Sequence, residues 1–156
     1  MPRMATSPSQ TETGHESPFV RNFNLFLPNR VGRLSELLDL MGGQAVEIAG
    51  LSVIDSTDWA VVRMVFTEPD KAREVLSRNG VAFTESEVLG IVLSDPDSLS
   101  RATKALLAAE LNVQFAYPLL VRHEGMPIMV VHVEDTVLAA QILAKHGFVL
   151  MDLKGR

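Results

Sequence analysis

The patterned part of the chain begins with a period-two alternation of hydrophobic and polar residues between about Phe19 and Leu27, which predicts a strand. The spacing then changes to that of one buried helical stripe, carried by Leu34, Leu37, Leu38 and Met41. It predicts a helix from about Gly32 to Met41, which Gly42 and Gly43 end. A short loop that contains Gly32 joins this strand to this helix.

Four further elements follow in the same half of the chain: a strand, a strand, a helix and a strand. We expect them at Val46–Ile54, at Trp59–Thr67, from Pro69 to about Asn79, and from Val81 onward. Turn residues at 55–58 join the first two into a hairpin. Pro69 suits the first turn of its helix, and Gly80 ends that helix.

The second half of the chain repeats the first. Ala72–Val81 matches Ala139–Phe148 at an offset of 67, and Leu34-Ser35 matches Leu99-Ser100 at an offset of 65. A repeat of this length has the size of a small domain, not of a solenoid unit. The second set of elements is expected at Val88–Leu93, about 98–110, Asn112–Val121, Ile128–Val133, about 136–146 and Phe148–Leu153.

The order strand, helix, strand, strand, helix, strand therefore occurs twice, which is the split βαβ, ferredoxin-like plan. The sequence predicts an α+β fold of two such units in tandem, with antiparallel sheets and the helices on one face. We place a disordered tail at residues 1–18, a first domain at 19–87 and a second at 88–156. The stretch Val81–Leu93 has no strong turn signal, so the domains are expected to join almost without a linker.

Composition limits the classes of function. Hydrophobic residues make up 47% of the chain and charged residues 21%, as in a globular protein with a core, and the formal charge of −5 argues against general nucleic-acid binding. Cysteine is absent, no apolar run is long enough to cross a bilayer, and the amino-terminal stretch lacks the apolar centre of a secretory signal. We expect a cytoplasmic protein with no nucleic-acid or membrane partner.

Candidate catalytic chemistry is weak. The histidines, His15, His123, His132 and His146, lack the spacing of a helical metal pair, and no phosphate-binding glycine loop with its lysine is present. No serine has an evident base in the sequence. We predict a protein that is not an enzyme, with no catalytic residue, no metal and no cofactor.

The loop that ends at Gly32 is the strongest candidate for binding. The first backbone N–H groups of a helix have no partner within the helix and, with the helix dipole, can hold a carboxylate or phosphate. Gly32 permits close approach of the backbone, and Arg30 or Arg33 can add a charge-assisted hydrogen bond. The alternative is an ordinary turn with no ligand.

The loop motifs resemble those of the ACT domain family, small amino-acid-sensing modules of metabolic regulation. The resemblance runs from about residue 19 to 156 and rests on Asn29-Arg30-Val31-Gly32-Arg33-Leu34, on Asp95-Pro96-Asp97-Ser98-Leu99 and on Asn112-Val113. Val31 stands where the family usually has Pro, and Asp97 where it has Gly. Residues 43–48 also look like part of the small regulatory subunit of acetolactate synthase.

This resemblance implies an amino-acid ligand at a domain interface, near the loop after each first strand. The implied site residues are Asn29, Arg30, Val31, Gly32 and Arg33 in the first copy, and Asp95, Pro96, Asp97 and Ser98, with Asn112 nearby, in the second. Asp97 is expected to cap its helix and to repel an anion, so the first loop is the better carboxylate site. The second loop then contacts an ammonium group or is purely structural.

The expected function is non-catalytic sensing of a small amino acid and regulation of a metabolic enzyme, acetolactate synthase being the first candidate. The alternative is a dimerisation or interaction module that has lost ligand binding. Strand residues 61–66 are apolar on both sides, so the sheet face away from the helices should also be covered. A homodimer or a larger enzyme can cover it, or the two copies can cover each other within one chain.

Overall fold

The computed structural model describes residues 19–151 and 153; the expected amino-terminal tail lies outside these residues. The elements are β1 (Phe19–Pro28), α2 (Arg33–Gly43), β2 (Ile48–Asp55), β3 (Trp59–Phe66), α3 (Pro69–Arg78), β4 (Ala82–Val92), α4 (Ser98–Ala108), β5 (Val113–His123), β6 (Met126–Val133), α5 (Thr136–Lys145) and β7 (Leu150–Met151). The tandem ferredoxin-like order predicted from the sequence is confirmed.

All the described strands join one antiparallel sheet in the order β2-β3-β1-β4-β6-β5, with β7 beside β4. Strand β4 belongs to both units. Its residues 82–89 pair with β1, whereas its residues 89–92 pair with β6. The boundary that we place between residues 87 and 88 falls inside this continuous strand and stays a prediction.

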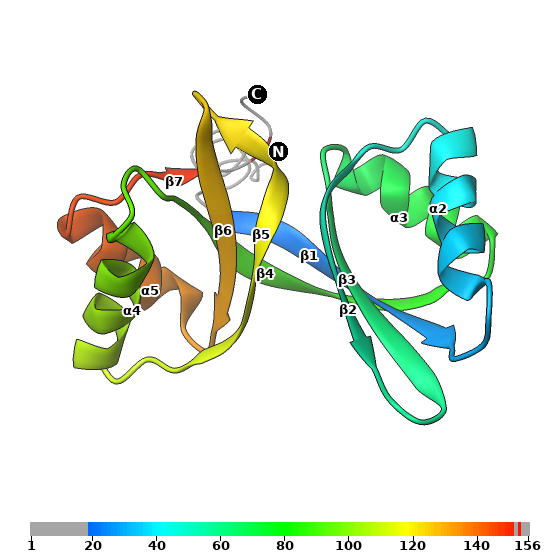
Figure 1. Cartoon of the computed structure of the whole chain (residues 1–156), viewed down its shortest axis with the longest axis horizontal. Helices are drawn as coiled ribbons and strands as arrows, with labels where there is room; N and C mark the ends of the chain where they lie inside the picture. The colour runs from blue at the N-terminus through cyan, green and yellow to red at the C-terminus, as the bar shows by residue number, and fades with distance from the viewer. Residues whose placement is uncertain (1–18, 152, 154–156) are drawn as a thin grey trace, which may run out of the picture.

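Each half has its own core between sheet and helices, and the helices lie on the two outer sides of the molecule (Figure 1). In the first half, alternate residues of β1 pack against α2 and α3, with Phe23, Leu25 and Leu27 essentially inaccessible. In the second half, Leu89 and Ile91 of β4 pack with α4 and α5 around Leu106 and Leu143. The same side of β4 therefore faces the helices in both halves.

The sheet faces that carry no helices meet each other in the middle of the molecule. A third core joins Val65 of the first half to Tyr117, Leu119 and Val130 of the second. β2 passes so close to β5 that a Cβ on Gly50 would lie 2.5 Å from a Leu119 methyl carbon. The two copies thus cover much of each other, which was one of the alternatives left open by the sequence.

The helix ends differ in one respect from the prediction. Gly42 and Gly43 are the last residues of α2, and the left-handed residue is Ala45, with φ 57°. The N–H of Val46 donates to the Met41 carbonyl at 2.9 Å, a bond that requires a left-handed residue directly before its donor. Glu110, with φ 61°, has the same role after α4.

Candidate functional site

The loop between β1 and α2 is fastened at its first residue. The Asn29 amide Nδ2 donates to Asp55 Oδ1 at 2.7 Å and to the Ser56 carbonyl at 2.6 Å, and the Asn29 N–H donates to the Asp58 carbonyl at 3.0 Å. These bonds join the loop to the turn between β2 and β3. Asn29 therefore has a structural role, which leaves the rest of the loop to contact a ligand.

Gly32 has the conformation that the motif requires. Its φ of 90° and ψ of −10° lie in the left-handed region, where glycine is strongly favoured. It immediately precedes α2, and no side chain forms a cap bond there. The neighbouring Val31 is 98% exposed, so the loop is open to solvent. The backbone conformation is the one expected from the sequence for an anion site at this helix start.

Sequence reasoning missed Glu36, which shares this loop with both arginines. Arg33 Nη1 lies 2.9 Å from Glu36 Oε1 and Arg30 Nη2 lies 3.4 Å from the same oxygen. The hydrogen bond from Arg33 is the main reason why the pKa of Glu36 is lowered. A ligand carboxylate must therefore compete with Glu36 for these two charges. The i, i+3 spacing of Arg33 and Glu36 was the available signal.

One donor near the loop is unused. Arg33 Nε is buried and has no hydrogen-bond partner. A buried unpaired N–H is costly and needs an explanation, such as a ligand, a water or another group that completes the bond. Arg33 is thus the better supported of the two candidate arginines.

The loop before α4 is built differently. Asp95 Oδ1 accepts the N–H of Asp97 at 2.8 Å, and Asp95 Oδ2 lies 3.1 Å from Arg101 Nη2. The backbone bond from Asp97 is the main reason why the pKa of Asp95 is lowered. Buried Ser98 accepts the Asp95 N–H at 3.1 Å, whereas Pro96 is exposed. The polar groups of this loop bond to one another, so it offers fewer free hydrogen-bond donors than the first loop.

Two details of the second copy correct the expectation. The Asp97 side chain forms no cap bond; the Asp95 carboxylate instead accepts the N–H of Asp97 itself. Asn112 is not near this loop: it follows the far end of α4, an 11-residue helix of about 16 Å. The first and second loops precede α2 and α4, which lie in different halves of the molecule (Figure 1).

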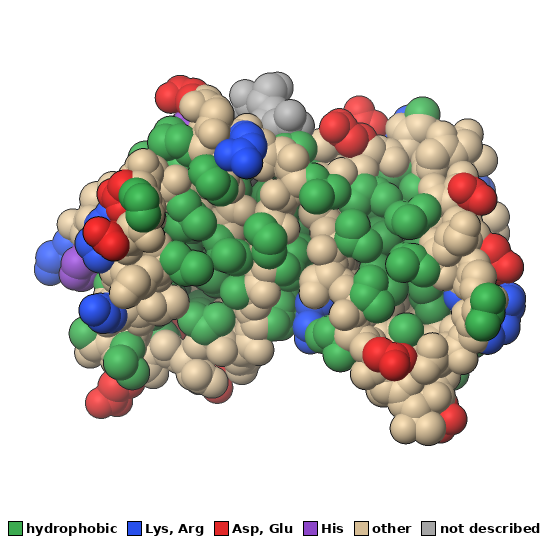
Figure 2. Space-filling view, in the orientation of Figure 1, with side chains coloured by type: hydrophobic (Ala, Val, Ile, Leu, Met, Phe, Trp, Pro, Cys, Tyr) green, Lys and Arg blue, Asp and Glu red, His purple; other side chains and the backbone are tan. Residues whose placement is uncertain are grey.

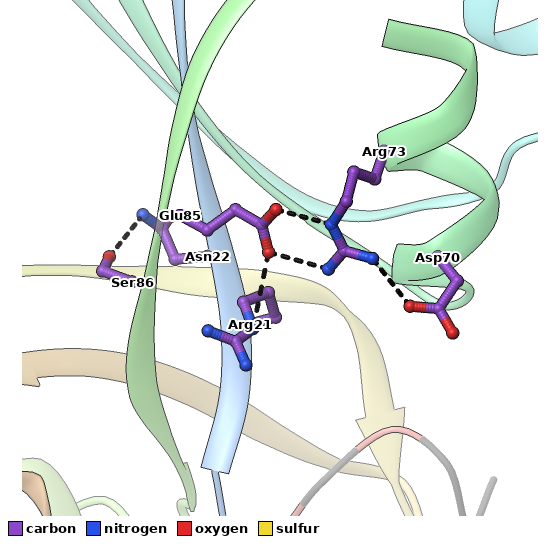
Figure 3. A network of polar contacts seen from close by, with 6 residues as sticks. All are labelled: Arg21, Asn22, Asp70, Arg73, Glu85 and Ser86. Carbon is purple, nitrogen blue, oxygen red and sulfur yellow. Dashed lines mark hydrogen bonds and ion pairs between the residues drawn. The ribbon is translucent and has the colours of Figure 1, made fainter. Parts of the chain in front are cut away.

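The best-connected ion pairs lie away from both loops, where α3 meets β4 (Figure 3). Arg73 holds Glu85 with two hydrogen bonds, of 2.6 and 2.8 Å, and Asp70 with a third of 2.7 Å. Arg21 adds a longer contact to Glu85 at 3.6 Å. The bonds from Arg73 lower the pKa of Glu85. The network fastens α3 to the shared strand β4, so we assign it a structural role.

Among residues 19–151 and 153, no group of three or more His, Asp or Glu side chains is placed to hold a metal ion. Within the same residues no helix is long and apolar enough to span a membrane.

Comparison with known proteins identifies the family. The model of the ACT domain pair matches residues 19–152, and the chain belongs to this family. The resemblance stated from the loop motifs is confirmed. No match was found among curated proteins.

Solved structures share the fold. A protein of Bacteroides thetaiotaomicron superposes with a TM-score of 0.77 at 21% identity, covering 86% of this chain and 94% of its own. The ligand-free regulatory subunit of aspartate kinase from Thermus thermophilus gives a TM-score of 0.55 at 11% identity, with 81% and 91% covered. A structure of aspartokinase alpha and beta subunits gives 0.52 at 15% identity, with 82% and 91% covered.

Proposed function

We propose that this protein is a non-catalytic regulatory module that binds a small amino acid at the loop around Gly32 and transmits its occupancy to a metabolic enzyme. The observation that carries the proposal is the combination of an ACT domain pair with a left-handed Gly32 before an uncapped helix. Arg33, with one buried unpaired donor, supplies the charge for the ligand carboxylate. The self-satisfied loop of the second copy supports uneven binding by the two copies.

The partner enzyme is a finer part of the proposal. Acetolactate synthase remains the first candidate, on the likeness of residues 43–48 to its small regulatory subunit. One of the structural neighbours is a regulatory subunit of aspartate kinase, a likeness that supports the fold and not a particular enzyme. The cytoplasm is the compartment proposed for such a partner. Acetolactate synthase activity with and without this protein, at each amino acid in turn, tests the pairing.

A homodimer is the assembly we propose. Hydrophobic side chains gather on both halves of the face seen in Figure 2, between the strands near the middle of the molecule and the helices at its sides. Val53 on β2 is 47% exposed and Leu120 on β5 is 67% exposed. Exposed apolar surface of this kind supports contact with another protein. Sedimentation at micromolar concentration measures the state, and a clean monomer counts against it.

A thermal-shift screen of the twenty amino acids tests the binding itself. Stabilisation by one or two of them is expected, because a ligand that binds only the folded state raises its stability. Gly32→Asp should abolish the shift, since it adds a carboxylate beside the arginines, whereas Asp97→Ala should keep it. Loss of binding only in Asp97→Ala would contradict the assignment.

A specific observation favours a second function. Glu36 already pairs with both Arg30 and Arg33, so each arginine has a counter-charge without a ligand. A module that has lost ligand binding and serves only for dimerisation or docking fits this arrangement. If none of the twenty amino acids shifts the melting temperature of either the wild type or Glu36→Gln, the dimerisation or docking function is favoured.

A further inference from the structure

The helix-free face of the first half carries side chains in distinct rows across four neighbouring strands. Strand register aligns a polar row, which consists of Ser52, Arg63, Asn24 and Thr84. Two residues further toward the turn between β2 and β3, the register aligns an apolar row, which consists of Ile54, Val61, Phe26 and Ala82. Trp59 lies next to this apolar row, opposite Pro28.

The second half of the molecule covers only the inner part of this face. On the inner side of the polar row, Asn22 and Val65 are completely buried. On the outer side, Ile54 is 41% and Trp59 50% exposed. The lower outline of the molecule is indented between its two halves, and hydrophobic and basic side chains lie at the wall of this indentation (Figure 2). The sheet-on-sheet packing thus ends in an open groove.

Arg63 lies where the covered part of the face ends. Its Nε donates to Asn24 Oδ1 at 3.2 Å, and its guanidinium carbon lies 3.9 Å from the centre of the Phe115 ring. The Phe115 ring stacks in turn on His132, at 4.8 Å between ring centres. These contacts come from both halves and hold the guanidinium in one orientation, because one of its faces lies on an aromatic ring.

No carboxylate lies within ion-pair distance of Arg63 among residues 19–151 and 153. Most arginines in this part of the chain do have such a partner: Arg21, Arg30, Arg33, Arg73, Arg78 and Arg101. The other exception, Arg122, is exposed and donates to the Gly125 carbonyl. Arg63 is partly buried, and removing a charge from water without a counter-charge is costly. An anion in the groove would remove this cost.

We propose that the open end of the groove is a binding site for a small carboxylate with an apolar side chain. The Nη edge of Arg63 holds the carboxylate with paired hydrogen bonds. The apolar side chain of the ligand lies on Val61, Phe26 and Ile54. Residues two apart on a strand are separated by about 7 Å, so the distance from the charge to the apolar row suits an acid of about five to seven carbons.

This site differs from the loop around Gly32 in position and composition. It needs no second chain, because Arg63 and Phe115 come from the two halves of one chain. It also does not depend on the proposed function, and each can fail alone. A ligand here would tie the halves together at the margin of their interface.

Intrinsic fluorescence tests the proposal, since Trp59 is the only tryptophan of the chain. The probe is 4-methylpentanoate, with acetate and 4-methylpentan-1-ol as controls that lack the side chain or the charge. We expect a saturable change with a Kd of about 1 mM for the full probe, the range typical of a ligand of this size, and at least 10-fold weaker binding of either control.

Variants locate the site. Arg63→Gln should weaken 4-methylpentanoate binding at least 10-fold, while the matched variant Arg122→Gln and the loop variant Gly32→Asp leave it unchanged. If Arg63→Gln does not fold, Arg63→Lys, which keeps the charge but loses the paired geometry, should still weaken binding several-fold. The proposal is overturned if the wild type shows no saturable binding of 4-methylpentanoate. It is also overturned if Arg63→Gln and Arg122→Gln bind 4-methylpentanoate equally well.

Discussion

Replacing Tyr117 by Phe tests whether the halves are held together by a specific hydrogen bond. The Tyr117 hydroxyl donates to Asn22 Oδ1 at 2.5 Å, and the two residues are 4% and 0% exposed. The Asn22 amide nitrogen donates to Asn24 Oδ1 at 3.1 Å and to Ser86 Oγ at 3.2 Å. Removing the hydroxyl leaves the Asn22 oxygen buried without its donor.

The magnitude follows from this geometry. An unsatisfied buried acceptor costs about 1 to 3 kcal/mol, so we expect Tyr117→Phe to lose about 2 kcal/mol of the free energy of unfolding. For a chain of this size the melting temperature should fall by about 4 to 8 °C. Urea denaturation followed by circular dichroism measures the loss. Thr84→Val, which removes the exposed acceptor of the Asn24 amide, serves as control and should cost less than about 0.5 kcal/mol.

The pH dependence gives a second readout of the same bond. Burial raises the pKa of Tyr117 above its usual 10.0. Above pH 10 the unfolded chain ionises this tyrosine whereas the folded chain does not, so its contribution is complete below that pH and is lost as the pH rises. The Phe variant should lack this part of the alkaline loss. A cost under 0.5 kcal/mol, or an alkaline profile that Tyr117→Phe leaves unchanged, would refute the reasoning.

Two further substitutions test the ion-pair network between α3 and β4 and the close contact between β2 and β5. Glu85→Gln should cost about 1 kcal/mol at pH 7. The lowered pKa of Glu85 gives stability that is present above its usual 4.5 and lost as the pH falls through the lowered pKa, so the cost of the substitution should shrink at acidic pH. Glu74→Gln, in an exposed pair, is the control for the denaturation series. Gly50→Ala should cost about 2 kcal/mol, since its Cβ would lie 2.5 Å from a Leu119 methyl carbon and 3.3 Å from its Cα. Gly42→Ala, with nothing within 4 Å, should be neutral or stabilising; equal melting temperatures of these two glycine variants would contradict the close approach.

The local pattern was sufficient for the elements, because period and turn chemistry are properties of neighbouring residues. Phe23, Leu25 and Leu27 are buried as their alternation predicts, and Gly80 is left-handed with φ 69° at a helix end. Asn22 is the counterexample. Its alternation places it on the polar side of β1, yet it is fully buried, because its partner Tyr117 stands 95 residues away. No short-range pattern contains that contact.

The candidate site shows the same limit. The residue type of Gly32 predicted a backbone conformation that the structure has, with φ 90°. The electrostatics of the loop could be obtained only in part: the i, i+3 spacing indicates the pair of Arg33 and Glu36, whereas the contact of Arg30 with the same oxygen depends on the folded loop. The Asp97 side chain forms no cap bond, and its own N–H donates to Asp95 in the turn that precedes α4. Residue type predicts which backbone conformation a position can adopt, whereas the hydrogen-bond and ion-pair partners of its side chain depend on the fold.

Because strand β4 belongs to both halves, the same alternate residues along it must face the helices in both. Odd-numbered residues face the helices at both ends of the strand: Phe83 in the first core, Leu89 and Ile91 in the second. Inserting a single residue near position 87 would keep one half in register and turn the core residues of the other half outward. An insertion of two would restore the alternation and only lengthen the strand. The alternation of buried and outward-facing residues therefore continues along β4 from one repeat to the next. The middle of β4 should tolerate insertions or deletions only of an even number of residues.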